Sequence, residues 1–271
     1  FWNSSLDLNE GKTVVEIIKG INSDEIKGLY VQGENPAMSD PDLTHTRKAL
    51  AKLDHLVVQD IFMTETAWFA DVILPASAHA EKLGTYTNTN RQVQIGRNVV
   101  DPPKGVKQDW WIIQEIAKRM GLNWNYSSPK EIFNEMKLIM PSLNNISWER
   151  LEKENHVTYP AMSENVPGED IIFIDDFPTS NKLAKIVPVE LINPNDELNS
   201  DFPLILSTGR LLEHWHTGTM TRKAIILNEL EPDPIIFINE IDSKFYNIDL
   251  TKAVTIETRR GKINIKIRYD N

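Results

Sequence analysis

Residues 28–75 read GLYVQGENPAMSDPDLTHTRKALAKLDHLVVQDIFMTETAWFADVILP. Three short apolar runs in this stretch predict buried strands at residues 28–32, 56–58 and 72–74. A helix is expected near residues 41–53, and a shorter helix capped by Thr64 is expected after the second strand. Strands and helices in this alternation, with short connections, are typical of parallel βαβ units. The stretch therefore predicts an α/β fold built on a parallel sheet.

Polar residues and a glycine follow the predicted strands. Gly33, Glu34 and Asn35 come after the first strand, and Gln59 and Asp60 after the second. Right-handed crossovers bring these ends to one edge of the sheet, where open α/β sheets bind ligands. Glu34 and Asp60 can accept hydrogen bonds from guanine N–H groups or ribose hydroxyls. The alternative is that Asn35 only shapes a turn and Asp60 only caps a helix. An NAD or ATP site has no support, because no Gly-x-Gly-x-x-Gly or Walker lysine motif is present.

A second ligand-type stretch, PLILSTGRLLEHWHTGTMTR, covers residues 203–222. Its apolar run at 204–206 predicts a buried strand that ends in a turn. Cationic and hydroxyl donors then cluster around two glycines: Arg210, His214, His216, Thr217, Thr219 and Arg222. Such a loop suits an anionic ligand, because glycine lets backbone N–H groups approach phosphate and arginine can bind it bidentately. The alternative is that both histidines are ordinary surface or core residues.

Composition narrows the class of protein. The length of 271 residues suits about two domains. The net charge of −10 argues against a nucleic-acid partner, which requires a basic face. No apolar run approaches the roughly 20 residues of a membrane helix, and no signal peptide opens the chain. Cysteine is absent, which excludes disulfides and cysteine-ligated clusters within these residues. The first residue is Phe1, so we expect the chain to begin partway through a longer protein.

An acidic stretch divides the sequence. Residues 152–201 hold eleven Asp and Glu against three Lys, a balance of −8, and lack a sustained period. They predict an irregular connector with one strand-like piece at 185–191. Residues 1–151 form the predicted α/β domain. Residues 202–271 are mostly strand-forming, with a hairpin at 253–258 and 262–268, and predict a β-barrel left incomplete because it has few strands.

Several separated motifs occur in a characteristic order. They are GENP (33–36), VVQDIF (57–62), TETA (64–67), ADVILP (70–75), EKLGTYTNTNRQVQ (81–94), TGR (208–210) and HWHTGTMTR (214–222). Together they closely resemble the molybdopterin oxidoreductases, and most closely the catalytic (alpha) subunits of molybdenum-dependent formate dehydrogenases. The resemblance implies a Rossmann-like α/β domain followed by an incomplete, double-psi-like β-barrel domain.

The resemblance also implies a cofactor, a molybdenum or tungsten atom held between two molybdopterin guanine dinucleotides. Gly33, Glu34, Asn35, Gln59 and Asp60 would contact one dinucleotide, with Thr66 and Asp71 close by. Asp109 would reach a guanine base. The residues expected to hold pyrophosphate and pterin are Thr208, Gly209, Arg210, His214, Thr217, Gly218, Thr219 and Met220.

The implied reaction is oxidation of formate to carbon dioxide, with two electrons passing through the metal to 4Fe-4S clusters. The family's metal ligand, a cysteine or selenocysteine helped by histidine and arginine, has no match here and is expected upstream of Phe1. We therefore assign no catalytic residue and no metal ligand to this chain. Electron-transfer subunits are the expected partners. The expected location is cytoplasmic, or periplasmic if an export signal lies upstream.

Two alternatives stay open. The chain could belong to another bis-molybdopterin guanine dinucleotide oxidoreductase, such as a nitrate reductase-like enzyme or a respiratory complex subunit. It could instead be a guanine nucleotide-binding domain without a redox role.

Overall fold

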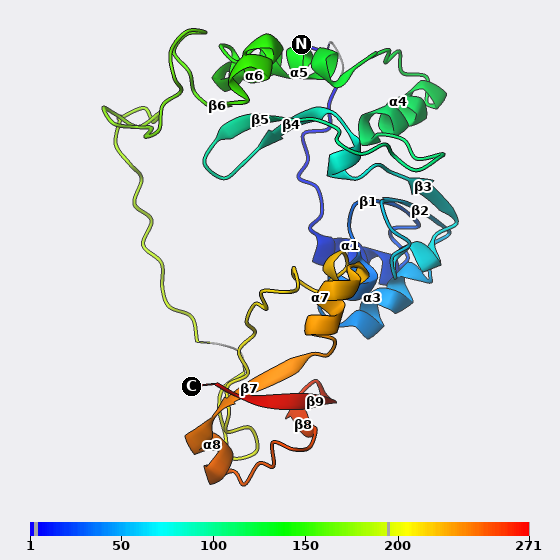
Figure 1. Ribbon diagram of the computed structural model, residues 1–271, viewed down its shortest axis with the longest axis vertical. Coiled ribbons are helices and arrows are strands. Elements are labelled where there is room, and N and C mark those ends of the chain that lie inside the picture. Colours follow the sequence, from blue (N-terminus) through cyan, green and yellow to red (C-terminus); the bar gives the residue numbers. More distant parts are fainter. Residues whose placement is uncertain (3–4, 194–195, 271) are drawn as a thin grey trace. The chain divides into compact units, whose positions relative to one another are not determined.

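The computed structural model describes residues 1–2, 5–193 and 196–270. Its first sheet contains three parallel strands in the order β1 (Gly28–Gln32), β2 (His55–Asp60) and β3 (Val72–Pro75) (Figure 1). All three strands lie where the apolar runs predict them, so the prediction of a parallel α/β sheet is confirmed.

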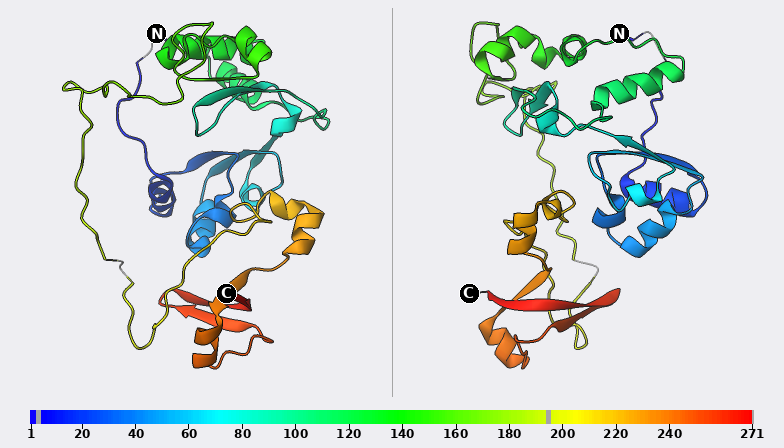
Figure 2. Two further views of the ribbon diagram at one scale, coloured as in Figure 1. Left: turned by 60° about the vertical axis from the view of Figure 1, so that its left-hand side comes forward. Right: turned by 45° about the vertical axis from the view of Figure 1, so that its right-hand side comes forward.

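Three helices lie on the same face of this sheet (Figure 2). They are α1 (Val14–Asn22), the short α2 (Pro36–Ser39) and α3 (Leu43–Leu50). A capping box starts α1, because the Thr13 hydroxyl accepts from Glu16 N–H and the Glu16 carboxylate accepts from Thr13 N–H. Among the described residues, two clusters of buried apolar side chains form the core here. One lies between the sheet, α2 and α3, with Val31, Ala37, Leu50, Leu56, Val58 and Ala67, and the other joins α1 to α3, with Ile18, Ile21 and Ala49.

A second, antiparallel sheet follows in the order β4 (Gly84–Thr87), β5 (Gln92–Gly96) and β6 (His156–Thr158). Its neighbours are α4 (Asp109–Arg119), α5 (Pro129–Ile139) and α6 (Trp148–Glu154). Val93, Phe133, Trp148 and Leu151 are buried together in its core. Gln108 occupies the N-cap position of α4, and Asp109 is its first helical residue.

Two arginines hold the first part of the predicted connector. The Arg91 guanidinium donates to the carbonyls of Tyr159, Glu169 and Asp170. The Arg150 side chain is only 5% exposed. It pairs with Glu154 and donates to three backbone carbonyls, those of Asn145, Ser163 and Val166. Residues 185–191 form no strand, so the prediction of a strand-like piece there is wrong.

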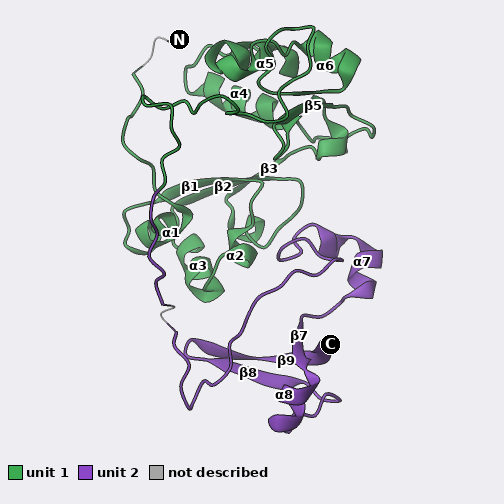
Figure 3. Ribbon diagram, turned by 90° about the vertical axis from the view of Figure 1, so that its left-hand side faces the viewer, with its two compact units in different colours: residues 1–186 green, residues 187–271 purple. Residues whose placement is uncertain are grey.

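The chain divides into two compact units, Phe1–Ile186 and Val187–Asn271 (Figure 3). The division falls within the predicted connector. The second unit contains a three-stranded sheet in the order β7 (Ile235–Asn239), β9 (Gly261–Asp270) and β8 (Val254–Thr258). The predicted hairpin is confirmed, since β8 and β9 are antiparallel, whereas β7 and β9 are parallel. The described residues of the unit also form the short helices α7 (Ile225–Leu230) and α8 (Glu240–Phe245) and a 3-10 helix, Thr221–Lys223.

The second unit corrects one prediction and leaves another open. Residues 204–206 form no strand, and Ile205 is 79% exposed, so the expectation of a buried strand there is wrong. An apolar run becomes a strand only where another strand accepts its backbone hydrogen bonds, and none of the described strands pairs with it. Among the described residues the three strands do not close a barrel. The double-psi-like topology therefore stays a prediction.

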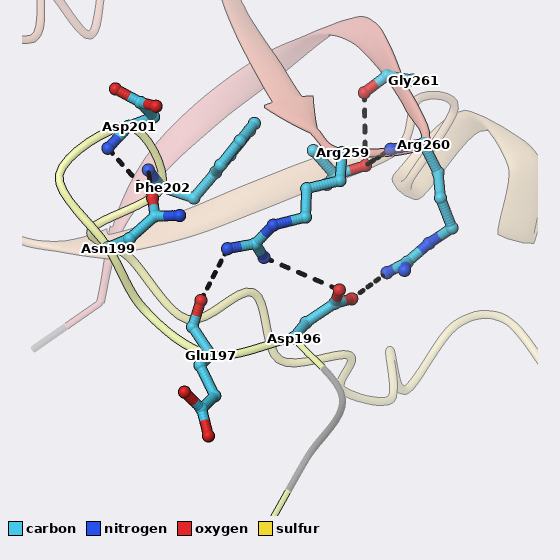
Figure 4. A network of polar contacts seen from close by, with 9 residues as sticks. Asp196, Glu197, Asn199, Asp201, Phe202, Arg259, Arg260 and Gly261 are labelled. Carbon is cyan, nitrogen blue, oxygen red and sulfur yellow. Dashed lines mark hydrogen bonds and ion pairs between the residues drawn. The ribbon is translucent and has the colours of Figure 1, made fainter.

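The hairpin turn of this unit is tied to residues 196–202 (Figure 4). Arg259 donates to the carbonyl of Glu197, and its guanidinium lies 4.8 Å from the ring centroid of Phe202. Both Arg259 and Arg260 pair with Asp196. The hydrogen bond from Arg260 holds the pKa of Asp196 below its ordinary value. The end of the predicted connector is thus bonded to the β8–β9 turn.

Arg150→Met should destabilise the first unit by about 3–5 kcal/mol, because it removes a buried charge that has partners and leaves three carbonyls without a donor. Chemical denaturation measures this change. Arg119→Met is the matched control, since Arg119 makes a surface pair with Glu115 that contributes about 0–1 kcal/mol. Equal losses of stability for the two substitutions would contradict the stabilising role of the bonds from Arg150 to the three carbonyls.

Candidate functional site

The carboxyl ends of β1 and β2 lie side by side, because Gln32 is in register with Gln59. The Gly33 N–H extends this pairing by donating to the Gln59 carbonyl at 2.9 Å. Gly33 has φ +63°, and a Cβ at this position would meet no atom within 4 Å. The turn therefore needs glycine for its backbone conformation, and the space beside it is open to a ligand.

Asn35 and Thr66 are buried and bonded to each other. The Asn35 side-chain oxygen accepts from the Thr66 backbone N–H at 3.0 Å and from its hydroxyl at 2.8 Å. The Asn35 amide also donates to Glu65 at 2.7 Å, and the Thr66 hydroxyl accepts from Ala37 N–H. These bonds join the turn after β1 to the loop after β2. The structure thus favours the alternative that Asn35 shapes a turn, and a contact between either residue and a ligand stays a prediction.

Gln59 connects the sheet edge to Asp109. Its side chain is fully buried, and its amide donates to Asp109 Oδ1 at 2.7 Å. The Tyr30 hydroxyl donates to the Gln59 side-chain oxygen, and Lys82 pairs with Asp109 Oδ2. The structure therefore brings two predicted residues together with two that were not predicted, Tyr30 and Lys82. The sequence feature that could have pointed to Lys82 as a site residue is its position in the motif at residues 81–94.

Asp60 directs one carboxylate oxygen to the backbone. Its Oδ1 accepts from the N–H groups of Ile61 at 2.7 Å and Phe62 at 3.1 Å. In the part of the chain that the structure describes, no group donates to its Oδ2. Burial raises the pKa of Asp60, the two N–H groups oppose that shift, and the charge of Asp109 adds to it. Asp60 thus has one acceptor atom that the fold does not use.

Glu34 is exposed beside these groups. Burial, and then the negative charge of Glu34, raises the pKa of Asp40. The edge of the sheet is therefore rich in hydrogen-bond acceptors and negative charge.

Asp71 lies at the opposite edge of the sheet. It precedes the first residue of β3, and its carboxylate accepts from the Leu56 N–H at 2.7 Å, near the start of β2. Its other neighbour is His55, whose Nδ1 lies 3.7 Å from Asp71 Oδ2. The expectation that Asp71 lies close to Gly33 and Gln59 is therefore wrong. Its carboxylate bonds the amino ends of two strands instead.

The loop of the second unit is organised by His214, which is buried. The ring Nδ1 lies 3.1 Å from the Thr221 hydroxyl oxygen, and Nε2 lies 2.7 Å from the Glu231 carbonyl oxygen. Because a carbonyl can only accept, Nε2 carries a proton. Both ring nitrogens are therefore used within the second unit, by Thr221 in the loop and by Glu231 at the end of α7, and a ligand would have to replace one of these bonds. His214 matches the alternative of an ordinary core histidine.

Gly218 forms a tight turn in the same loop. It has φ +82°, and a Cβ there would lie 2.8 Å from Arg222 Cγ. The Arg222 N–H donates to the Gly218 carbonyl at 2.9 Å, and its guanidinium donates to Asn228 and the Pro232 carbonyl. Arg222, which the sequence suggested as a ligand donor, is thus engaged by the fold.

The remaining predicted residues of this loop are more accessible. Exposed positions are Thr208, Gly209, Arg210, Thr217 and Met220, and Thr219 is half-buried. The Arg210 guanidinium lies 5.8 Å from the ring centroid of Trp215, an exposed residue that was not predicted. Cationic, hydroxyl and aromatic groups therefore lie on the surface of one loop.

Within residues 1–2, 5–193 and 196–270, no three His, Cys, Asp or Glu side chains are grouped so that they could hold a metal ion. Nor does any helix in these ranges have the length and apolar character needed to cross a membrane.

The two parts of the chain match two related family models. Residues 3–119 match the model described as Molybdopterin oxidoreductase. Residues 204–271 match the model described as Molydopterin dinucleotide binding domain. The chain belongs to the molybdopterin oxidoreductase family.

Similar proteins carry names from the same family. An F420-dependent formate dehydrogenase subunit alpha of Methanocaldococcus jannaschii is 44% identical over 99% of this chain, which spans 40% of that protein. A probable oxidoreductase, YjgC of Bacillus subtilis, is 38% identical over 98% of this chain and is matched over 27% of its own length. Among solved structures, acetylene hydratase from Pelobacter acetylenicus has a TM-score of 0.70 at 20% identity, over 94% of this chain and 37% of that one. This last likeness concerns the fold alone.

The hydrogen-bond acceptors at the sheet edge and the donors on the loop each fit one part of a pterin dinucleotide. Guanine and ribose present N–H and O–H donors, which suit the carboxylates at the sheet edge and the unused Oδ2 of Asp60. Pyrophosphate is anionic, which suits the guanidinium of Arg210 and backbone beside a glycine. The acceptors for guanine and ribose belong to the first unit, and the donors for pyrophosphate belong to the second.

Asp60→Asn should raise the melting temperature at neutral pH, because burial disfavours the ionised carboxylate that the amide replaces. The folded pKa lies above the ordinary value of 3.8, so the charge lowers stability as pH rises through the folded pKa and has no effect below 3.8. The gain should therefore disappear in acid. Melting curves recorded from acid to neutral pH measure this gain in melting temperature. A gain that does not depend on pH would contradict a raised pKa for Asp60.

Gly218→Ala should destabilise the second unit by about 1–2 kcal/mol, because it forces alanine into the left-handed region and against Arg222. Gly209→Ala is the control, since Gly209 lies outside that region and a Cβ there meets nothing within 4 Å. Denaturant unfolding should show no loss for Gly209→Ala. A loss as large as that of Gly218→Ala would mean that the fold itself requires Gly209.

Proposed function

We propose that this chain provides cofactor-binding residues of a molybdenum or tungsten enzyme that oxidises formate to carbon dioxide. The observation that carries the proposal is a match of chemistry to position. Acceptor groups lie at the sheet edge of the unit that matches the oxidoreductase model, and Arg210 and exposed hydroxyls lie on a loop that matches the dinucleotide-binding model. The 44% identity to a protein named as a formate dehydrogenase subunit supports the choice of substrate.

The cofactor in this proposal is a bis-molybdopterin guanine dinucleotide. At the sheet edge, Asp60 and Asp109 would accept hydrogen bonds from guanine or ribose, and Glu34 would add acceptors. The Gly33 turn would admit the ligand, and Asn35, Gln59 and Thr66 would fix the walls. When bound, the metal centre supplies the two-electron chemistry; the residues of this chain bind and orient.

The loop of the second unit would hold pyrophosphate and pterin. Arg210 would contact phosphate, and His214 and Gly218 would keep the loop in shape. The further contacts proposed for this loop are those of Thr208, Gly209, Thr217, Thr219 and Met220.

The whole protein would use formate as substrate and pass electrons to partner subunits through 4Fe-4S clusters held by residues outside this chain. We propose a cytoplasmic location. The alternatives are another bis-dinucleotide oxidoreductase and a guanine nucleotide-binding protein without a redox role. The fold likeness to a hydratase does not separate these reactions, because one fold can carry different chemistry.

Metal and nucleotide analysis of the complete protein tests this proposal. Protein isolated from cells that make the cofactor should contain molybdenum or tungsten, release guanosine monophosphate in a ratio to metal of about two, and reduce an electron acceptor with formate. Metal and nucleotide without formate oxidation would favour another oxidoreductase of the family. Guanine nucleotide without metal would favour the binding protein.

Arg210→Ala locates the cofactor on the loop in the same assay. It should lower the metal and nucleotide content and leave the melting temperature unchanged, because Arg210 is exposed and its guanidinium lies over the Trp215 ring at 5.8 Å from the centroid. Arg119→Ala removes another exposed charge, on α4, and should change neither quantity. Unchanged cofactor content in Arg210→Ala would exclude the loop as the phosphate site.

A further inference from the structure

Asp109 is the first residue of α4, yet its carboxylate does not cap that helix. The N–H groups of Trp111 and Ile112 donate to the carbonyl of Gln108 instead. Both carboxylate oxygens of Asp109 bond to side chains that are distant in the sequence, those of Gln59 and Lys82. Capping of α4 is therefore not what these two bonds of Asp109 serve.

A hydrogen bond from the Tyr30 hydroxyl to the side-chain oxygen of Gln59 fixes the orientation of the Gln59 amide. Burial raises the pKa of Tyr30, and the charge of Asp109 adds to the shift, so the phenol keeps its proton at neutral pH and donates. It donates to the side-chain oxygen of Gln59, which leaves the NH2 group facing Asp109 Oδ1 at 2.7 Å. Gln59 is fully buried, so its amide meets these partners and not water.

Lys82 provides the second restraint. Its ammonium pairs with Asp109 Oδ2, and the two side chains are 24% and 27% exposed. A charge-assisted bond in such a half-buried place is stronger and better defined than a surface pair. Lys82 lies between the 3-10 helix His79–Glu81 and β4, so this pair also links the second sheet to α4.

We propose that Lys82 and Gln59 are positioning residues that hold the Asp109 carboxylate ready to accept two hydrogen bonds from a guanine base. Each carboxylate oxygen has two lone pairs. Gln59 uses one on Oδ1 and Lys82 uses one on Oδ2, so each oxygen keeps one for the ring N–H and the amino group of guanine. Holding the carboxylate in place before binding reduces the entropy lost on binding. This inference rests on the proposed function and adds the origin of its base specificity.

The test uses the complete protein without its cofactor, with GDP and IDP as probes in calorimetric titrations. IDP lacks only the amino group of guanine. The wild type should bind GDP about tenfold more tightly than IDP, the effect of one hydrogen bond to a charged group. Lys82→Met keeps the aliphatic stem and removes the charge. It should bring the two affinities to within about twofold by weakening GDP binding.

Two further variants separate positioning from stability. Lys130→Met removes a surface pair with Glu149 and should leave the ratio of GDP to IDP affinity at the wild-type value. Tyr30→Phe removes the hydroxyl that orients Gln59 and should lower the ratio in part. Tyr30 is 40% exposed as a residue, so this variant should fold even where Lys82→Met does not.

The outcomes are distinct. A wild-type preference for GDP that Lys82→Met and Tyr30→Phe leave unchanged would overturn the positioning role, as would an equal weakening of GDP and IDP binding. A wild type that binds both nucleotides equally, or neither, would overturn the guanine site at this edge together with the inference that rests on it.

Discussion

The parallel pairing of β1 with β2 is the constraint on which the candidate site of the first unit depends. Because Gln32 is in register with Gln59, the turn at Gly33 and the carboxylate of Asp60 reach the same edge of the sheet. A register shift by one residue would turn every side chain of a strand to the other face. It would expose Val58, which is fully buried, and remove Gln59 from Asp109. The apolar core therefore determines where the polar groups of the edge lie.

The polar groups of this edge serve the fold and the proposed ligand at once. Buried polar atoms without partners are costly, so Asn35 bonds to Thr66 and Gln59 bonds to Asp109. These bonds join loops that follow different strands, and they limit the positions that the loops can take. A ligand at this edge would meet walls that are already fixed. Preorganisation of this kind favours binding, because little entropy is left to lose.

Local sequence patterns predicted the strands and the hairpin better than they predicted the contacts between distant residues. Short apolar runs predicted β1 to β3, and alternation predicted the β8–β9 hairpin, because those signals depend on neighbouring residues. The run at 204–206 failed, since hydrophobicity gives a tendency to be buried and does not supply a partner strand. Asp109 contacts residues 27 and 50 positions away, and no periodicity in the sequence indicates such pairs. The resemblance named the site residues, but it could not separate those that the fold already uses.

The structure separates residues that the fold already uses from residues that remain available to a ligand. His214 and Asn35 have partners within the chain that account for their chemistry, and Gly218 has a backbone conformation and a close neighbour that require glycine. Gly209 has neither requirement, and no described group donates to Oδ2 of Asp60. Groups that the fold does not use are the ones free to contact a ligand. Direct contact is therefore proposed for atoms that keep hydrogen-bonding capacity, such as Oδ2 of Asp60 and the second lone pair on each oxygen of Asp109, and the buried residues hold these atoms in place.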